Sequence, residues 1–421
     1  MSVNKDTLKQ IIYERHDIIK NMDIMPRKYD LEENGNYVVT GLRRAGKTTV
    51  LYMRVQDLIK KGVSYDQIIY INFEDERLTE FNINDFNEIL EVKAEICDKK
   101  PYYFFDEIQN ITGWEKFARR MADSNERVYI TGSNAKMLSK EIESALGGRY
   151  FSKYITTYNF KEYLQANNVS FEEKDLYKSE SIGKIKKYFN EYFRFGGFPE
   201  AVKYVHKREY VSGIYQKILL NDIIARNDIR NENALKVLVK KISETVCQPV
   251  SYTKLHNIVQ SVGFKVSKDT LIDYMGHIKD AYLLYDVQNY YAKFVEKESN
   301  PKYYFRDNGL LNLFLQDKDS ALLENVVGLH LLNNNEEVYY LKSNKNDIDI
   351  DFYLPEKNVA VQVAYSLDIT NEERETDSLI NFAKENKQSR LIIVTYDTEE
   401  TIEKNGITIE VIPAYKFLLR F

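Results

Sequence analysis

The sequence of 421 residues contains only two cysteines, Cys97 and Cys247, which lie far apart and without the spacing of metal ligands. Neither a disulfide framework nor a zinc site is therefore supported. The chain also lacks any run approaching the roughly 18 apolar residues of a membrane-spanning helix. Its first residues, MSVNKDTLKQ, lack an apolar signal core. We expect a protein without a membrane segment, located in the cytoplasm.

The chain also has no excess of basic over acidic residues. The chain carries 59 basic and 64 acidic side chains, which gives a formal net charge of −5 at pH 7. This balance argues against a nucleic-acid partner held by bulk charge alone, but it leaves room for a local basic face. With 43% hydrophobic and 29% charged residues the composition is that of a globular chain. At about 150 residues per domain, the length predicts two or three domains.

Short apolar runs alternate with longer amphipathic segments between residues 35 and 165. The runs YVVT, QIIYINF, YYFFD and VYITGS predict strands, and the amphipathic segments between them predict helices. This order is typical of a parallel sheet with helices on both faces. Before it, residues 1–34 contain the amphipathic segment LKQIIYERHDIIKNM, which predicts a lead-in helix.

The remainder of the chain divides into three regions by its pattern. Residues 166–235 are mostly helical, interrupted by the turn GGFP, and predict a helical connector. Residues 236–300 predict a compact helical unit that leads into the apolar strand AYLLYDV. In residues 301–421 strands return, among them KYYFRD, IDIDFYL and RLIIVTY, and predict a second α/β domain.

Residues 41–50, GLRRAGKTTV, fit the pattern G-x-x-x-x-G-K-[ST] directly after the predicted strand YVVT. Between a strand and a helix, such a loop directs backbone N–H groups and a helix amino terminus at phosphates. Lys47 is expected to bridge the β- and γ-phosphates, and Thr48 to ligate magnesium through its hydroxyl. We therefore predict ATP and Mg²⁺ as cofactors. The predicted nucleotide-binding residues are Gly41, Arg43, Arg44, Ala45, Gly46, Lys47, Thr48 and Thr49.

A pair of acidic residues follows a second predicted strand in PYYFFDEIQ, residues 101–109. Asp106 and Glu107 thus lie at the carboxyl end of a strand, the edge where open parallel sheets bind ligands. Asp106 is predicted to hold the magnesium shell and Glu107 to activate the attacking water. A solvated acidic strand end is the alternative.

The third predicted strand with polar residues at its end is RVYITGSN, residues 127–134. Ser133 or Asn134 is expected to hydrogen-bond the γ-phosphate or the attacking water. Asn134 is favoured because its amide both donates and accepts. A polar turn after any strand would have the same pattern, so a structural role stays open.

Together, GLRRAGKTT, YYFFDEIQNITGWEKFARRMAD, TGSNAKMLS and GGRY with TTYNFKEYL resemble the bacterial and archaeal AAA-superfamily ATPases that carry a C-terminal domain of unknown function. GGFPEAV, KYYFRDNGLL and LLENVVGLHLL extend this resemblance over nearly the whole chain. It implies a water-activating ATPase core, with Ser133 or Asn134 at the position called sensor 1. It also implies an arginine that contacts the γ-phosphate from the same or a neighbouring subunit of a homo-oligomer. Arg149 in GGRY is its counterpart, and a surface or structural role for Arg149 stays open.

The region 236–290 resembles a winged helix, with helices at VSYTKLHNIVQSVG and VSKDTLIDYMGHIKDA. Double-stranded DNA bound through residues 251–290 is therefore one candidate partner. However, residues 236–280 hold seven basic against four acidic side chains, which is little charge for phosphate neutralisation. A contact with an unknown protein, or a purely structural role, is the alternative. The residues expected to face a DNA groove are Lys268, Thr270, Tyr274 and His277.

The last region resembles the restriction-endonuclease-like fold that family members carry. In that fold a helix Glu, a strand Asp and an E-x-K on the next strand gather magnesium and activate water. The counterparts here are Glu324, Asp351 with Asp349 beside it, and the run from Gln362 to Ala364. Because glutamine replaces a carboxylate and alanine the lysine, we predict a nuclease fold without nuclease activity. A residual metal site at Glu324, Asp349, Asp351 and Gln362, or a solvated acidic face, both stay open.

The sequence thus predicts an α/β protein with a P-loop NTPase sheet of the AAA type, a winged-helix-like region and a restriction-endonuclease-like domain. Its predicted function is Mg²⁺-dependent ATP hydrolysis coupled to a conformational change at a DNA or protein partner. The alternative is a nucleotide-gated binding module with negligible turnover. A metal-dependent nuclease is less favoured because of Ala364.

Overall fold

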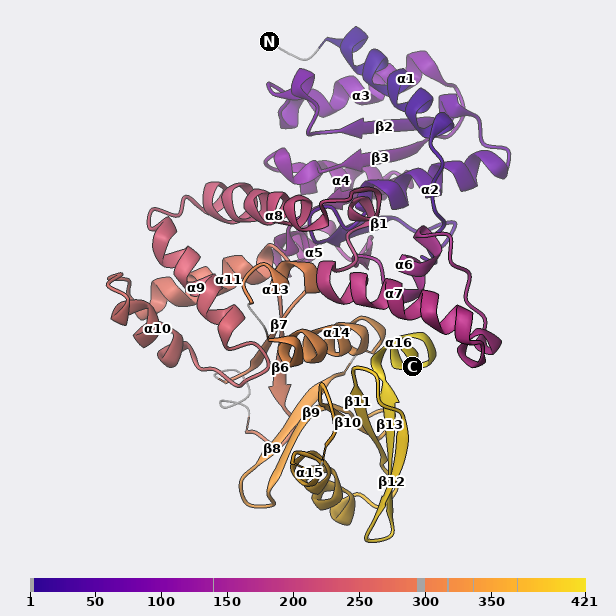
Figure 1. The fold of residues 1–421 in the computed structure, drawn as a ribbon. Helices are drawn as coiled ribbons and strands as arrows, with labels where there is room; N and C mark the ends of the chain where they lie inside the picture. The colour runs from indigo at the N-terminus through magenta and orange to yellow at the C-terminus, as the bar shows by residue number, and fades with distance from the viewer. Residues whose placement is uncertain (1–3, 139, 294–299, 316–317, 336, 369) are drawn as a thin grey trace. The chain divides into compact units, whose positions relative to one another are not determined.

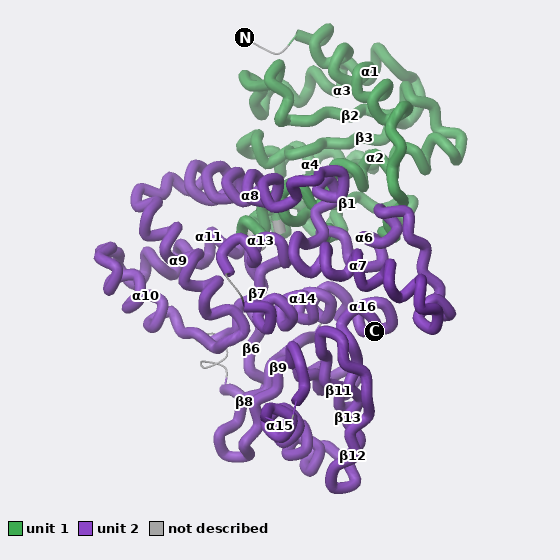
Figure 2. The backbone as a smooth tube through the Cα atoms, in the orientation of Figure 1, with its two compact units in different colours: residues 1–156, 280–282 green, residues 157–279, 283–421 purple. Residues whose placement is uncertain are grey.

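The protein structure, a computed structural model, describes residues 4–138, 140–293, 300–315, 318–335, 337–368 and 370–421 (Figure 1). It contains two compact units, residues 1–156 with 280–282 (unit 1) and residues 157–279 with 283–421 (unit 2), coloured separately in Figure 2. No helix within the described ranges is long and apolar enough to cross a membrane.

Unit 1 is built on a parallel sheet. In its described part the strands follow the spatial order β2-β3-β4-β1-β5, and every neighbouring pair is parallel. All carboxyl ends therefore lie at one edge, and β4 lies between β1 and β3. This arrangement confirms the predicted P-loop NTPase type of sheet. The strands are β1 (Tyr37–Gly41), β2 (Ile68–Asn72), β3 (Tyr102–Asp106), β4 (Arg127–Gly132) and β5 (Phe151–Ile155).

Helices bury both faces of this sheet. Alternate residues of β2 point to opposite faces: Ile69 and Ile71 join a core with α1, α3 and α4, whereas the Tyr70 ring packs on Tyr52 of α2. The strands β1 to β4 are buried along almost their whole length, which explains their nearly continuous apolar sequence, whereas the edge strand β5 is buried only at Ile155. The helices are α1 (Lys5–Asn21), α2 (Lys47–Lys60), α3 (Phe86–Ile96), α4 (Trp114–Asp123) and α5 (Lys140–Leu146).

Unit 2 contains a mixed sheet with the order β12-β13-β11-β10-β9-β8-β6-β7 in the residues that the structure describes. β10, β11 and β13 are parallel neighbours, whereas β9 is antiparallel to both β8 and β10. The strands are β6 (Leu284–Asn289), β7 (Lys302–Phe305), β8 (Tyr339–Ser343), β9 (Ile348–Leu354), β10 (Val359–Val363), β11 (Arg390–Thr395), β12 (Glu400–Lys404) and β13 (Ile407–Pro413).

The helices of unit 2 lie before, between and after the strands of this sheet in the chain. A π-helical segment, Ile218–Ile224, continues α8 without a break in the chain. The helices are α6 (Phe160–Ala166), α7 (Ser179–Phe195), α8 (Lys207–Lys217), α9 (Glu232–Glu244), α10 (Tyr252–Ser261), α11 (Lys268–Asp280), α13 (Asn308–Asn312), α14 (Asp319–Asn334), α15 (Glu372–Glu385) and α16 (Ala414–Arg420).

The strand that sequence analysis placed at the end of a winged helix belongs to this sheet. β6 pairs antiparallel with β7, Leu284 opposite Phe305, and parallel with β8. The predicted boundary at residue 301 therefore runs between two paired strands. The lead-in helix α1 also differs from its prediction as a separate segment, because it packs on β2 within unit 1.

Two motifs of unit 2 meet at the buried carboxylate of Asp307. Its Oδ2 accepts a hydrogen bond from the Gly197 N–H at 2.8 Å, and its Oδ1 accepts one from Gly309 at 2.9 Å. A Cβ on Gly197 would lie 2.1 Å from the Tyr158 carbonyl oxygen, so only glycine fits there. GGFP and RDNG are therefore structural motifs that join the end of α7 to the start of α13.

Candidate active site

The loop between β1 and α2 has the backbone shape that phosphate binding requires. Gly41, Arg44 and Gly46 have positive φ angles of 148°, 63° and 102°. A Cβ on Gly41 would lie 2.2 Å from the Ile155 carbonyl oxygen of β5, so this position needs glycine. Helix α2 begins at Lys47 with no side-chain cap, which leaves its first backbone N–H groups for an anion.

Lys47 lies beneath this loop with 4% of its side chain exposed. Its Nζ donates to the carbonyl oxygens of Gly41 at 3.2 Å and Leu42 at 3.3 Å. The same ammonium lies 3.7 Å from Glu107 Oε1. The buried cation and the helix amino terminus together suit a polyphosphate.

Asp106 ends β3 and is completely buried. The Thr131 hydroxyl donates to Oδ1, the Tyr70 hydroxyl donates to Oδ2 at 2.9 Å, and the Thr48 hydroxyl is a third donor. Burial raises the pKa of Asp106 and the charge of Glu107 raises it further, while the three hydrogen bonds lower it. Thr48 and Asp106 are thus in contact, and their oxygens are the hard ligands that Mg²⁺ prefers.

Glu107 has a left-handed backbone, with φ 53° and ψ 42°. Such a conformation is uncommon outside glycine, and strain of this kind clusters at functional sites. The Glu107 N–H donates to Thr131 Oγ1 at 2.9 Å, and its carboxylate accepts from Gln109 Nε2 at 2.5 Å beside Lys47. The two adjacent carboxylates therefore differ: Asp106 is enclosed by hydroxyls, and Glu107 faces a cation and an amide.

The structure distinguishes the two sensor candidates at the end of β4. The Asn134 side-chain oxygen accepts from the Lys136 N–H at 2.7 Å and so stabilises the turn that follows the strand. The Ser133 hydroxyl is buried and has no hydrogen-bond partner among the described residues. Sequence analysis favoured Asn134, but the free buried hydroxyl makes Ser133 the better candidate.

The loop arginines take different positions around the phosphate-binding turn. Arg43 Nη2 lies 3.2 Å from Glu74 Oε1, so its guanidinium is directed to the loop after β2. Arg44 is exposed and supplies the left-handed turn of the loop. Thr49 follows Thr48 in the first turn of α2.

Arg149 lies at the opposite edge of the sheet from the phosphate-binding loop. The register of β1 with β5 pairs Tyr37 with Phe151 and Gly41 with Ile155, so Arg149 precedes the amino end of β5. Its guanidinium forms an ion pair with Asp123 at the end of α4. A strand of five residues spans about 17 Å, so Arg149 is placed away from the β1–α2 loop of its own chain.

Arg27 is a residue of the site region that sequence analysis missed. It lies between α1 and β1, and its buried guanidinium donates to the Ala45 carbonyl of the loop at 3.0 Å and to the Thr156 carbonyl at 3.0 Å. Beside it is a cavity of about 300 Å³, lined by Tyr29, Val50 and Met53 among others. No pattern around Arg27 marks it in the sequence, because its partners are backbone carbonyls brought close by the fold.

Lys302 of β7 reaches the acidic residues that were predicted to form a residual nuclease-like site. Its ammonium lies 2.9 Å from Asp351 Oδ1 and 3.4 Å from Glu324 Oε1, with 4% of the side chain exposed. The pattern of the nuclease-like fold places this lysine at residue 364, where alanine stands. The cation beside Glu324 and Asp351 is instead the Lys302 ammonium, which comes from β7.

Other groups also occupy the oxygens of these two carboxylates. The Val363 N–H donates to Asp351 Oδ2 at 3.0 Å, and the Tyr304 hydroxyl donates to Glu324 Oε1 at 2.7 Å. Burial, with Asp351 nearby, raises the pKa of Glu324. The cluster therefore has the contacts of a closed internal ion pair.

The two remaining members of the predicted nuclease-like set have other partners. The Gln362 side chain accepts from the Asp351 N–H at 3.2 Å and donates to Glu375 at 2.8 Å. Asp349 forms an exposed ion pair with Lys342 at 2.6 Å. In the part of the chain that the structure covers, no group of three or more His, Cys, Asp or Glu side chains is arranged to hold a metal ion.

Helix α11 presents a mixed surface rather than a basic one. Lys268 is exposed, as are Asp269, Ile272 and Asp273. Tyr274, which was predicted to face a DNA groove, is buried with 7% exposure because it lies on the core side of the helix. The position of Tyr274 corrects that part of the prediction.

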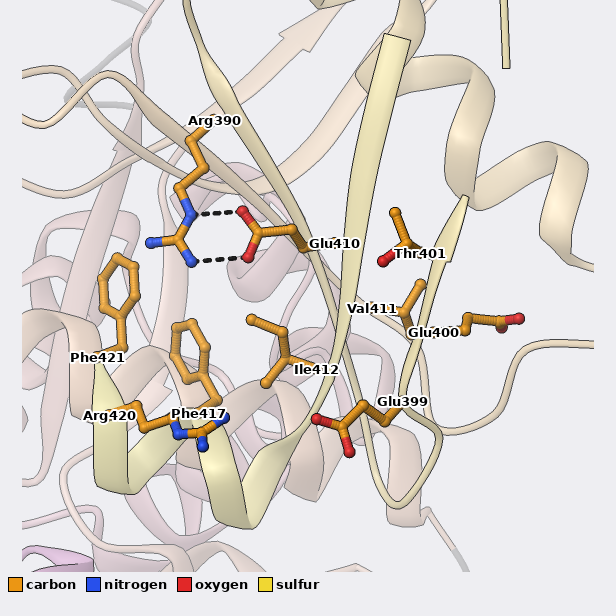
Figure 3. A pocket seen from close by; sticks show the side chains of 10 residues that line it. All are labelled: Arg390, Glu399, Glu400, Thr401, Glu410, Val411, Ile412, Phe417, Arg420 and Phe421. Atoms are coloured by element: carbon orange, nitrogen blue, oxygen red, sulfur yellow. Dashed lines mark hydrogen bonds and ion pairs between the residues drawn. The ribbon is translucent and has the colours of Figure 1, made fainter. Parts of the chain in front are cut away.

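Figure 3 shows a hollow of unit 2, between β12, β13 and α16. Its volume is about 340 Å³. The Arg390 guanidinium binds both carboxylate oxygens of Glu410, at 2.7 and 2.8 Å, and Phe417 and Phe421 stack beside them. Because the guanidinium is already paired in a bidentate contact, we assign no ligand to this hollow.

Comparison with known proteins places these features in a family. A model of the AAA domain matches residues 33–164, and a model of a domain of unknown function matches residues 186–321. An uncharacterized protein of Methanocaldococcus jannaschii is 33% identical, over 99% of this chain and 96% of that protein. An uncharacterized protein of Haemophilus influenzae is 31% identical, over 91% of this chain and 94% of that protein.

Solved structures show more distant similarity. A Walker-type ATPase of Pyrococcus abyssi is 11% identical, with a TM-score of 0.40, over 73% of this chain and 94% of that chain. The Orc1 protein of Aeropyrum pernix, solved in complex with DNA, is 13% identical, with a TM-score of 0.30, over 77% of this chain and 93% of that chain.

Proposed function

Because the chain belongs to the AAA-superfamily ATPases that carry a C-terminal domain of unknown function, we propose that it binds ATP with Mg²⁺ and hydrolyses it. The convergence of Lys47, Asp106 and Glu107 at one edge of the unit 1 sheet carries this proposal. The Lys47 ammonium is 3.7 Å from Glu107 Oε1, and Thr48 is hydrogen-bonded to Asp106.

In this proposal each residue has one task. Lys47 and the N–H groups of the loop bind the β- and γ-phosphates, while Thr48 and Asp106 hold the metal. Magnesium, when bound, neutralises phosphate charge and orients the terminal phosphoryl group. Glu107 accepts a proton from the attacking water, held in place by the Gln109 amide. Ser133 donates its otherwise unpaired hydroxyl to the terminal phosphate.

The cavity beside Arg27 suits the nucleoside end of ATP. It borders α2 within its first turns, at Val50 and Met53, and it includes the ring of Tyr29. Tyr29, Val50 and Met53 can bind the flat base of a nucleotide, and the charged residues that line the rest of the cavity, Asp30, Glu32, Arg54 and Asp57, can bind its polar groups. Arg27 joins the cavity to the phosphate-binding loop through the Ala45 carbonyl.

We propose that hydrolysis changes how unit 2 is presented to a partner. The exposed face of α11 combines Lys268 with Asp269, Ile272 and Asp273, which suits a protein surface better than a phosphate backbone. Duplex DNA bound through residues 251–290 is the second candidate. The alternative is a nucleotide-gated binding module, which would bind ATP at the same site but hydrolyse it at a negligible rate.

Steady-state phosphate release from Mg-ATP, measured with and without duplex DNA, separates these proposals. A rate of phosphate release that rises when DNA is added supports a DNA-coupled ATPase. A rate that is the same with and without DNA supports a protein partner. Tight ATP binding with negligible turnover in both conditions supports the binding module. Salt-sensitive duplex binding that Lys268→Glu abolishes would favour DNA at α11.

A further inference from the structure

A row of side-chain contacts links helix α1 to the carboxylate that is proposed to hold magnesium. Arg15 of α1 donates through Nη1 to the Tyr52 hydroxyl of α2 at 2.7 Å. The Tyr52 ring packs on the Tyr70 ring with the centroids 5.3 Å apart, and Tyr70 of β2 donates to Asp106 Oδ2 at 2.9 Å. Four residues from four different elements therefore form one path of contacts through the packed interior of unit 1.

The donors at the two ends of this path are fixed by chemistry. Arg15 can only donate, and an ionised Asp106 can only accept. The Tyr52 oxygen therefore accepts from Arg15, and the Tyr70 proton is used on Asp106. Between them the two tyrosine rings pack on each other, so a shift of Arg15 and Tyr52 changes the packing that holds Tyr70.

The path reaches Asp106 through the neighbouring strand β2 and not through the phosphate-binding loop itself. Thr131 and Thr48 bind Asp106 from β4 and from α2, next to the predicted nucleotide. Tyr70 instead fixes Oδ2 from β2, where α1 packs against the sheet. The orientation of this carboxylate therefore depends on α1 as well as on the loop.

We propose that Arg15, Tyr52 and Tyr70 are positioning residues that hold Asp106 in the orientation for magnesium, and that α1 thereby controls the metal-dependent part of nucleotide binding. This inference rests on the proposed function, since it concerns the same site. A partner that draws α1 away from β2 would weaken Mg²⁺ binding while the phosphate-binding loop stays intact.

The chain offers a matched control for this path. Arg54 Nε of α2 donates to the hydroxyl of Tyr129 in β4 at 2.9 Å, so Tyr129, like Tyr70, is a buried strand tyrosine whose hydroxyl is hydrogen-bonded to a charged group. No hydrogen bond joins Tyr129 to Asp106 in the described part of unit 1. Tyr129→Phe therefore removes the same group as Tyr70→Phe at comparable burial, without touching the proposed metal ligand.

The test measures the dissociation constant of a fluorescent ATP analogue in Mg²⁺ and in EDTA, for the parent, Tyr70→Phe, Arg15→Gln and Tyr129→Phe. We expect Tyr70→Phe to reduce the ratio of the two constants about tenfold, as loss of one hydrogen bond to a charged acceptor implies. Arg15→Gln reduces the ratio about threefold, because its effect passes through the packing of the two tyrosine rings. The constants in EDTA, and the ratio for Tyr129→Phe, stay at the parent values.

Two results would overturn the inference: a parent-like ratio in Tyr70→Phe, or an equal loss in Tyr70→Phe and Tyr129→Phe, which would indicate a general packing defect. If the thermal unfolding curve shows that Tyr70→Phe does not fold, the ratio of the two constants in Arg15→Gln tests the inference instead. Arg15 lies on α1 and is only partly buried, so its substitution is less disruptive to folding. A parent that binds the analogue without any magnesium dependence would contradict the proposed function itself.

Discussion

Lys47 Nζ lies 3.7 Å from Glu107 Oε1, so the cation of the phosphate-binding loop and the proposed water-activating carboxylate form one ion pair. The pair joins α2 to the end of β3 across the strand β4 that separates β1 from β3. Since both side chains are largely buried, each limits where the other can move. In the proposed mechanism, phosphate binding by Lys47 and release of Glu107 for catalysis would therefore be coupled.

Lys47→Ala is expected to weaken ATP binding by at least about tenfold, because it removes a buried cation from the phosphate site. Lys60→Ala is the matched control, since Lys60 lies at the other end of α2 and is 75% exposed. Titration of a fluorescent ATP analogue measures both variants. Unchanged affinity in Lys47→Ala would refute the assignment of the loop.

We propose that Arg149, which lies at the sheet edge opposite its own loop, contacts the γ-phosphate in a neighbouring subunit. Arg149→Ala is then expected to leave ATP binding intact and to abolish hydrolysis. Mixing Arg149→Ala with Glu107→Gln should restore phosphate release, since each variant supplies what the other lacks. Arg119→Ala, which also removes an arginine near Asp123, is the control. Full activity of Arg149→Ala alone would assign Arg149 to the α4 ion pair only.

The pKa of Asp307, raised by burial to about 6, predicts a pH-dependent stability of unit 2. A carboxyl group with a raised folded-state pKa contributes stability fully below its unfolded pKa near 4, and this contribution is lost as the pH rises through about 6. The stability of the parent relative to Asp307→Asn should fall by about 2 kcal/mol between pH 4 and pH 7. Urea unfolding of both proteins at the two pH values tests this, and a constant difference would contradict it.

Lys302→Met is expected to destabilise unit 2 by about 3–5 kcal/mol, because it leaves Glu324 and Asp351 as buried carboxylates without a cation. Mn²⁺ added without nucleotide should then raise the unfolding temperature of Lys302→Met, since a divalent ion can replace the ammonium. The parent and Lys342→Met, which breaks only the exposed pair with Asp349, should not respond. An equal rise in the parent, or a metal-dependent nick in plasmid DNA, would contradict the closed-site interpretation.

The sequence was informative where a function depends on residues close together in the chain. The phosphate-binding loop could be predicted because its glycines, Lys47 and Thr48 lie in one strand–turn–helix, and the pair at 106–107 because it ends an apolar run. These residues are local in sequence, so their pattern alone implies their geometry. The family resemblance that they support is confirmed by the relatives and the domain models.

Residues that meet only through tertiary packing could not be predicted in this way. Lys302 stands in an ordinary apolar strand, and only the pairing of β7 with β6 brings it to Glu324 and Asp351. In the sequence, Tyr70 cannot be distinguished from the other apolar residues of its strand. Only the structure shows that its hydroxyl donates a hydrogen bond to Asp106. Tyr274 was assigned to a surface because helical spacing alone does not say which face of α11 is buried.

The central claim is that this chain hydrolyses ATP through Glu107. Phosphate release from Mg-ATP by the parent and by Glu107→Gln, together with the ATP affinity of each, tests it most directly. The account predicts a fall in turnover of about 10²–10⁴-fold in Glu107→Gln, with ATP binding retained, because only the proton acceptor is lost. Hydrolysis by Glu107→Gln at the rate of the parent would contradict it.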